Sequence, residues 1–106
     1  KMIEDARALK DVGVEIIVLE CIPQVLAKRI TDEVDVITIG IGAGIDCSGQ
    51  VLVLYDVLGI TPGKRPKFSK DFLAESAEGK SITSAIESYV KAVKNLDFPA
   101  AEHSFD

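Results

Sequence analysis

One glutamate stands out in this sequence because it ends an apolar run. In the stretch IVLECIP, residues 17–23, Glu20 follows aliphatic residues and precedes Cys21, Ile22 and Pro23. A carboxylate that apolar neighbours partly desolvate becomes a better proton acceptor, as a general base requires. The structural alternative is a carboxylate that stabilises the start of the next helix, or that pairs with a buried Lys or Arg. Glu20 is therefore the candidate catalytic residue.

Glycines end the next apolar run, DVITIGIGAG, at residues 35–44. Their GxGxG spacing differs from the GxGxxG dinucleotide fingerprint, and the following IDCSGQ is typical of a turn and not of a helix start. One interpretation is a tight turn with close backbone approach. The other is a loop whose N–H groups face a ligand, which makes Gly40, Gly42 and Gly44 candidate cofactor-binding residues.

The cysteines, the histidine and Asp56 give little support to a cysteine nucleophile, a zinc site or a second catalytic acid. A cysteine nucleophile at Cys21 or Cys47 needs a base, and the one histidine, His103, lies in the tail. Without a CxxC pair, the two cysteines make a zinc site only if His103 and another ligand join them. Asp56, at the end of a third apolar run, is favoured as a helix or turn cap over a catalyst.

Length and charge narrow the function classes. The 106 residues fit one small domain, and 47% hydrophobic residues suffice for a core. The net charge of −5 argues against nucleic acid or an anionic membrane as partner, since phosphate binding draws on clustered Lys and Arg. No apolar run approaches the roughly 18 residues that cross a bilayer. KMIEDARALK at the start lacks a signal-peptide core, so we expect reduced thiols and a cytoplasmic location.

Helical and strand-like segments alternate along the first half of the chain, which predicts an α/β fold with parallel strands. The predicted strands are 14–20, 35–44 and 50–59, and the predicted helices are 1–12, 24–33, 71–78 and 82–96. Ser81 is the expected N-cap of the last helix. Its expected apolar face is Ile82, Ile86, Tyr89, Val90 and Val93. Glu20, Gly40–Gly44 and Asp56 would then end successive strands, where α/β proteins carry their sites.

Three parallel strands alone leave two open edges and uncovered apolar surface, which native proteins avoid. The chain is therefore expected to be part of a larger domain, or a piece that completes itself by assembly. Lys1 precedes Met2, so the sequence does not start where translation would start.

Several blocks together resemble the ketopantoate hydroxymethyltransferase family, also called 3-methyl-2-oxobutanoate hydroxymethyltransferase. The blocks occur in the family's order and span most of the chain. They are IVLECIPQVLAKRIT (17–31), TIGIGAG (38–44), CSGQVLVLYDVLGITPG (47–63), RPKF (65–68) and FPAAEHSF (98–105). The resemblance implies that residues 1–106 are the C-terminal portion of one (β/α)8 TIM barrel domain, with its strands six to eight and the following helices.

The resemblance also implies an activity. Family members transfer a hydroxymethyl group from 5,10-methylenetetrahydrofolate to 3-methyl-2-oxobutanoate, giving 2-dehydropantoate for pantothenate biosynthesis. They use Mg2+ to hold the keto acid, and the glutamate of the LEC(V/I)P motif, here Glu20, is the proton acceptor. Metal ligands are expected in the missing N-terminal part, so none is assigned in this chain. Family members form large rings of identical subunits, so a homo-oligomer is expected.

Two hypotheses follow from these observations. In the first, the chain is an enzyme part that carries the base Glu20 and is inactive alone, because the metal ligands are missing. In the second, it is a non-catalytic ligand-binding or assembly module that uses the GIGAG loop and its open strand edges. A natural start site near Lys1 and a discrete oligomer of the short chain would favour the second.

Overall fold

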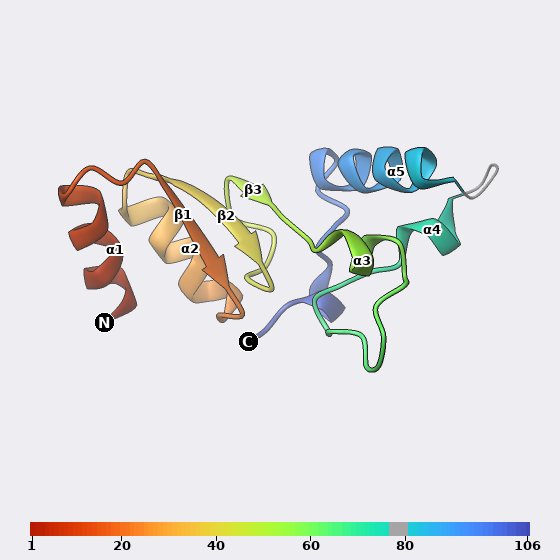
Figure 1. The fold of residues 1–106 in the computed structure, drawn as a ribbon. Coiled ribbons are helices and arrows are strands. Elements are labelled where there is room, and N and C mark those ends of the chain that lie inside the picture. The colour runs from red at the N-terminus through yellow and green to blue at the C-terminus, as the bar shows by residue number, and fades with distance from the viewer. Residues whose placement is uncertain (77–80) are drawn as a thin grey trace.

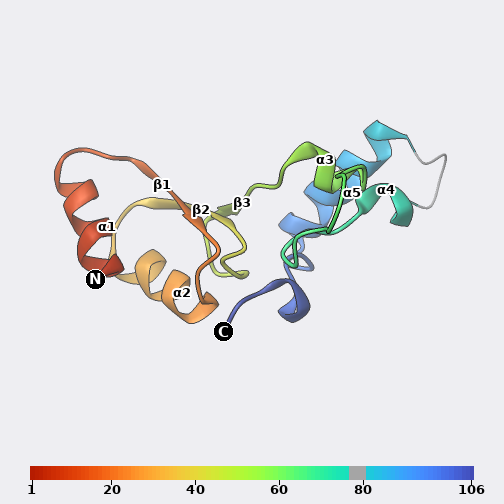
Figure 2. The same ribbon diagram turned by 60° about the horizontal axis from the view of Figure 1, so that its bottom comes forward.

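The chain is elongated in this computed structural model, which describes residues 1–76 and 81–106. Its extents are 47 × 23 × 21 Å, and its radius of gyration of 14.8 Å exceeds the about 13 Å expected for a compact domain of this length. A sheet with the first helices of the chain forms one lobe, and the later helices form the other (Figure 1). A second view shows the C-terminal tail returning from the helical lobe toward the sheet (Figure 2).

The sheet has three parallel strands in the order β1-β2-β3, which confirms the predicted α/β class. The strands are β1 (Ile16–Glu20), β2 (Ile37–Ile41) and β3 (Gly49–Gln50). In the register, Ile16 lies opposite Ile37 and Glu20 lies opposite Ile41. The predicted helices before and after β1 are present as α1 (Met2–Asp11) and α2 (Gln24–Glu33).

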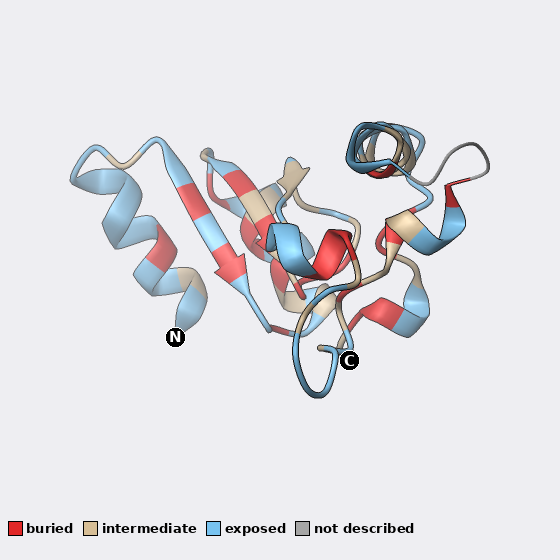
Figure 3. Cartoon of the chain, turned by 45° about the vertical axis from the view of Figure 1, so that its right-hand side comes forward, coloured by how far each residue is buried: buried red, intermediate tan, exposed pale blue. Residues whose placement is uncertain are grey.

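Helices cover only one face of this sheet. Ile17 and Leu19 of β1 point into a core with Ala27 and Ile30 of α2 and Ala6 of α1. The alternate residues of the strands lie on the uncovered face, and the colouring of Figure 3 alternates along β1 accordingly. Three aliphatic side chains there are more than half exposed: Ile16 (55%), Val18 (59%) and Ile37 (52%). Parallel sheets are normally covered on both faces, so this face lacks a partner within the described residues.

The third strand was predicted wrongly over most of its length. Strand pairing stops early because β2 ends at Ile41, and Val51 makes the last bond, from its N–H to the Gly40 carbonyl at 3.0 Å. The chain then turns into α3 (Leu54–Val57), and Asp56 lies inside this helix instead of at a strand end. Val57 and Leu58 are buried in the core of the helical lobe, which explains why an apolar run became helical.

The last helix, α5 (Ile82–Lys94), has Ser81 as its N-cap, as predicted, and the Ser81 hydroxyl accepts from the Ser84 N–H at 3.1 Å. It ends at Lys94 and not at the predicted residue 96. Its predicted apolar face was partly wrong. Tyr89 and Val93 do pack against the core, but together with the small residues Ala85 and Ala92. The other three predicted positions are exposed: Ile82 (59%), Ile86 (41%) and Val90 (43%).

The helical lobe has an aromatic centre. The Phe72 ring, from α4 (Phe72–Glu75), lies 5.3 Å from the ring centroids of both Tyr89 and Phe98. The predicted helix 71–78 is observed only over Phe72–Glu75, since Ser76 already has an extended backbone, and residues 77 and 78 lie outside the described residues. The tail contains one short 3-10 turn, η1 (Ala101–His103). Within the described ranges, no helix has the length and apolar character to span a membrane.

Candidate functional site

Glu20 is the last residue of β1, at the carboxyl end of the sheet, as the sequence predicted. Its side chain is exposed and belongs to the face on which Ile16 and Val18 are uncovered. The expected desolvation by Leu19, Cys21 and Ile22 is therefore absent in this chain, since Leu19 points to the opposite face and is buried. Any shielding of the carboxylate must come from whatever covers the open face.

The turn after Glu20 is held by several independent restraints. Cys21 has a φ of +50°, an uncommon value for a residue with a side chain, and its N–H donates to the Ile41 carbonyl at 2.9 Å. Ile22 is buried in the core beneath the sheet. Pro23 is the N-cap residue of α2. The backbone that carries Glu20 is thus fixed to β2 on one side and to the core on the other.

The GIGAG segment begins with the last two residues of β2, Gly40 and Ile41, and continues into the turn at the same end of the sheet; its three glycines are buried. A side chain at any of them would crowd neighbouring protein atoms. The nearest atoms belong to Cys47 at Gly40 (2.8 Å), to Phe68 and Phe105 at Gly42 (3.0 and 3.2 Å), and to Gln24 at Gly44. The tight-turn interpretation therefore accounts for these glycines, while ligand binding by Gly40, Gly42 and Gly44 stays a prediction.

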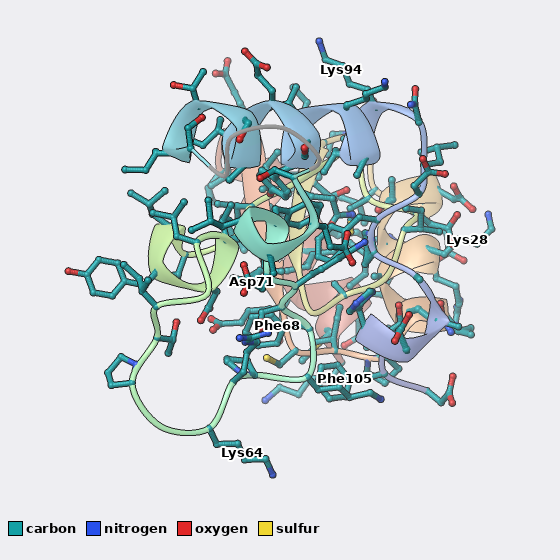
Figure 4. The ribbon with its side chains drawn as sticks, turned by 90° about the vertical axis from the view of Figure 1, so that its right-hand side faces the viewer. Lys28, Lys64, Phe68, Asp71, Lys94 and Phe105 are labelled. Atoms are coloured by element: carbon teal, nitrogen blue, oxygen red, sulfur yellow. The ribbon has the colours of Figure 1, made fainter. Side chains whose placement is uncertain are left out.

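The C-terminal tail reaches this same end of the sheet, which the sequence reasoning did not anticipate. Phe105 forms a parallel bridge with Pro23, and its carbonyl accepts from the Gln24 N–H at 2.9 Å. Lys67 donates from Nζ to the Ser104 carbonyl at 2.7 Å. Figure 4 shows Phe68 and Phe105 near one another. RPKF and EHSF carried the family resemblance, but no local pattern indicated that the two segments meet.

The two cysteines are free, Cys21 exposed and Cys47 half-buried. Burial raises the pKa of the Cys47 thiol, which keeps it protonated near neutral pH. His103 is buried, its Nδ1 accepts from the Ala100 N–H at 3.0 Å, and its ring lies 4.9 Å from that of Phe98. Burial also lowers the pKa of His103. The structure thus gives His103 a packing role in the helical lobe.

Asp56 is buried at 4% exposure, and its carboxylate accepts a hydrogen bond from the Thr61 hydroxyl. This bond fastens the loop that follows α3 to the helix. Asp56 therefore has a structural task, as the sequence favoured, although it ties a loop to the helix interior and does not cap a helix end.

Metal-binding groups do not gather near Glu20. No cluster of three or more His, Cys, Asp or Glu side chains in residues 1–76 and 81–106 is arranged to hold a metal ion. A hollow of about 640 Å³ lies beside Glu15, Ile16 and Asp35, but at the amino ends of the strands. Because sites in α/β proteins lie at the carboxyl ends, the Glu20 end remains the candidate site.

Known proteins similar to this chain agree on one family. The sequence model described as ketopantoate hydroxymethyltransferase matches residues 1–101. Proteins named 3-methyl-2-oxobutanoate hydroxymethyltransferase are 53% identical in Burkholderia vietnamiensis and 52% in Burkholderia mallei, each over 105 residues. A protein named 3-methyl-2-oxobutanoate hydroxymethyltransferase 1 from Burkholderia cenocepacia is 51% identical over the same length. Each alignment covers 99% of this chain but 38% of the relative.

Proposed function

Because this chain belongs to the ketopantoate hydroxymethyltransferase family, we propose that it is the C-terminal portion of a hydroxymethyltransferase. The complete enzyme would transfer a hydroxymethyl group from 5,10-methylenetetrahydrofolate to 3-methyl-2-oxobutanoate, giving 2-dehydropantoate. The observation that carries the proposal is the position of Glu20, at the carboxyl end of a parallel strand and exposed on an uncovered sheet face.

The uncovered face supports a larger parent fold. Aliphatic side chains of β1 and β2 are exposed on it, as they would be if further strands closed the sheet into a (β/α)8 barrel. In that arrangement the alternate residues of each strand fill the barrel interior. Glu20, the last member of the same series, would then stand at the rim where barrel enzymes hold their substrates.

Glu20 has a defined task in this proposal. Its carboxylate takes the proton from C3 of 3-methyl-2-oxobutanoate, the C3–H bond breaks, and the electron pair passes into the enolate. C3 then bonds to the one-carbon unit, and the two bonds from that unit to the folate nitrogens break. Water supplies the oxygen of the new hydroxyl group, and tetrahydrofolate leaves with one proton from C3 and one from water on its nitrogens. A carboxylate suits this step because the ketone next to C3 makes that proton acidic, and because the residues that complete the barrel would desolvate Glu20.

The described residues do not by themselves fit the Mg2+ of the family, because they offer no group of three suitable ligands. Hard cations of this kind need several oxygen ligands at short range. We therefore assign any Mg2+ ligands to residues outside this chain, and the role of the chain is confined to the proton at C3.

Substitution of Glu20 in the full-length enzyme tests this function. Glu20→Gln keeps the size of the side chain but removes its basicity, so kcat for 2-dehydropantoate formation should fall by about 10²–10⁴. Glu15→Gln is the matched control, because Glu15 is an exposed acid next to the amino end of the same strand. Normal turnover of Glu20→Gln would return Glu20 to a structural role.

The isolated 106 residues should be inactive, since they offer the base without a metal site. The test is deuterium exchange at C3 of 3-methyl-2-oxobutanoate, with Mg2+ in the buffer and only this chain present. Detectable exchange would contradict the assignment of essential groups to residues outside the chain.

A further inference from the structure

The tail and the turn after Glu20 are joined by backbone and side-chain bonds across 82 positions of sequence. The Gln24 N–H donates to the Phe105 carbonyl at 2.9 Å, and Gln24 Nε2 donates to Asp106 Oδ1 at 3.2 Å. Phe105 also pairs with Pro23 as an isolated parallel bridge. The N–H of Gln24 is one of the donors at the start of α2 that has no partner within the helix, so the tail supplies what a capping side chain would.

Lys67 holds this tail in place. Its Nζ donates to the carbonyl of Ser104, a residue only 4% exposed, at 2.7 Å. The same ammonium lies 4.9 Å from the centroid of the Phe105 ring, within range of a cation–π interaction. One lysine thus contacts two successive residues of the tail. We call Lys67, Ser104 and Phe105 the tail clasp.

The clasp lies outside both hydrophobic cores. Phe105 is half-buried and belongs neither to the core under the sheet nor to the core of the helical lobe. Its ring instead lies against Gly42, with Phe68 on the same glycine. The clasp therefore connects the RPKF loop, the GIGAG segment and the turn after Glu20, which meet at the carboxyl end of the sheet.

We propose that Lys67 and Phe105 are positioning residues for Glu20, acting through the Pro23–Gln24 turn. This inference rests on the proposed role of Glu20 as the base. Glu20 lies three residues before Pro23, and the intervening turn is held to β2 by the Cys21 N–H. With the clasp open, the start of α2 loses its tail partner, and the turn keeps only the Cys21 bond to β2 and the burial of Ile22. A displacement of about 1 Å at a reacting group can cost on the order of 100-fold in rate.

The test uses the full-length enzyme with Lys67→Met and Phe105→Ala. Lys67→Met keeps the alkyl chain and removes the ammonium, while Lys67→Arg restores a donor and a cation. We expect Lys67→Met and Phe105→Ala each to lower kcat by about 10- to 100-fold, with KM for 3-methyl-2-oxobutanoate within about threefold of wild type. Lys67→Arg should recover most of the rate. Lys70→Met is the control, because Lys70 also lies over a phenylalanine, Phe72, at 5.2 Å, but in the helical lobe.

Amide hydrogen exchange at Gln24 reports on the clasp independently of catalysis. The Gln24 N–H should exchange faster in Lys67→Met and Phe105→Ala than in wild type, and its exchange rate should be unchanged in Lys70→Met. Faster exchange with wild-type kcat would overturn the positioning role, and so would equal losses of kcat in Lys70→Met. Unchanged exchange at Gln24 would overturn the clasp itself. If Glu20→Gln instead keeps normal turnover, the proposed function fails, and the Gln24 amide still decides whether the clasp exists.

Discussion

Gly44 offers a quantitative test of how the loop after β2 packs against α2. Its φ is +83°, a region where a residue with a Cβ pays about 1–2 kcal/mol. A Cβ at this position would also collide with the Gln24 Cβ and lie 3.2 Å from the Gln24 Cα, so the start of α2 has to move. Overpacking of this kind costs about 1–3 kcal/mol. Gly44→Ala should therefore lower the free energy of unfolding by about 2–5 kcal/mol.

Gly63 is the matched control for this prediction. Its φ of +80° is nearly the same, but no atom lies within 4 Å of the Cβ position, so Gly63→Ala carries only the backbone cost of about 1–2 kcal/mol. The assay is denaturant unfolding of both variants of the full-length protein. The midpoints of unfolding are compared once the slopes of the curves (m-values) are shown to be equal. Equal losses of stability in the two variants would refute the close packing of Gly44 on Gln24.

Three further predictions concern buried polar groups. Thr38 is fully buried and its Oγ1 accepts from the Ser48 N–H at 3.1 Å, so Thr38→Val should cost about 1–3 kcal/mol in denaturant unfolding, and Thr38→Ser much less. The Tyr89 hydroxyl is buried without a hydrogen-bond partner among the described residues, so Tyr89→Phe should leave the midpoint of unfolding unchanged or raised; a clear decrease would reveal a partner. Burial lowers the pKa of His103 below its ordinary 6.5, because the folded state favours the neutral ring. The contribution of His103 to the free energy of unfolding should therefore be fully present above pH 6.5 and be lost as the pH falls toward the folded-state pKa. His103→Gln should flatten that dependence in thermal melts recorded against pH.

Local sequence patterns were sufficient for the elements that depend on local physics. The run of β-branched residues predicted β1 and β2, and the Ser81 cap marked the start of α5. They failed for 50–59, because strand formation there depends on how far β2 extends as a partner. Composition alone gave no reason for the chain to leave the sheet after Val51.

The sequence predicted the position of Glu20 in the candidate site but not the contacts of Lys67 and Phe105. The strand-end rule placed Glu20 correctly at the carboxyl end of the sheet, since it needs only the end of one apolar run. The exposure of Glu20 depends on what covers the open face, which no local pattern encodes. The contacts of Lys67 and Phe105 were missed because they join segments far apart in sequence through backbone carbonyls, which every residue possesses.

Deuterium exchange at C3 of 3-methyl-2-oxobutanoate, measured without folate, isolates proton removal by Glu20 from carbon transfer. We expect the full-length enzyme to exchange this proton, Glu20→Gln to lose the exchange by about 10²–10⁴, and Glu15→Gln to keep it. Exchange at the wild-type rate in Glu20→Gln would show that another group removes the proton, and would contradict the assignment of Glu20 as the base.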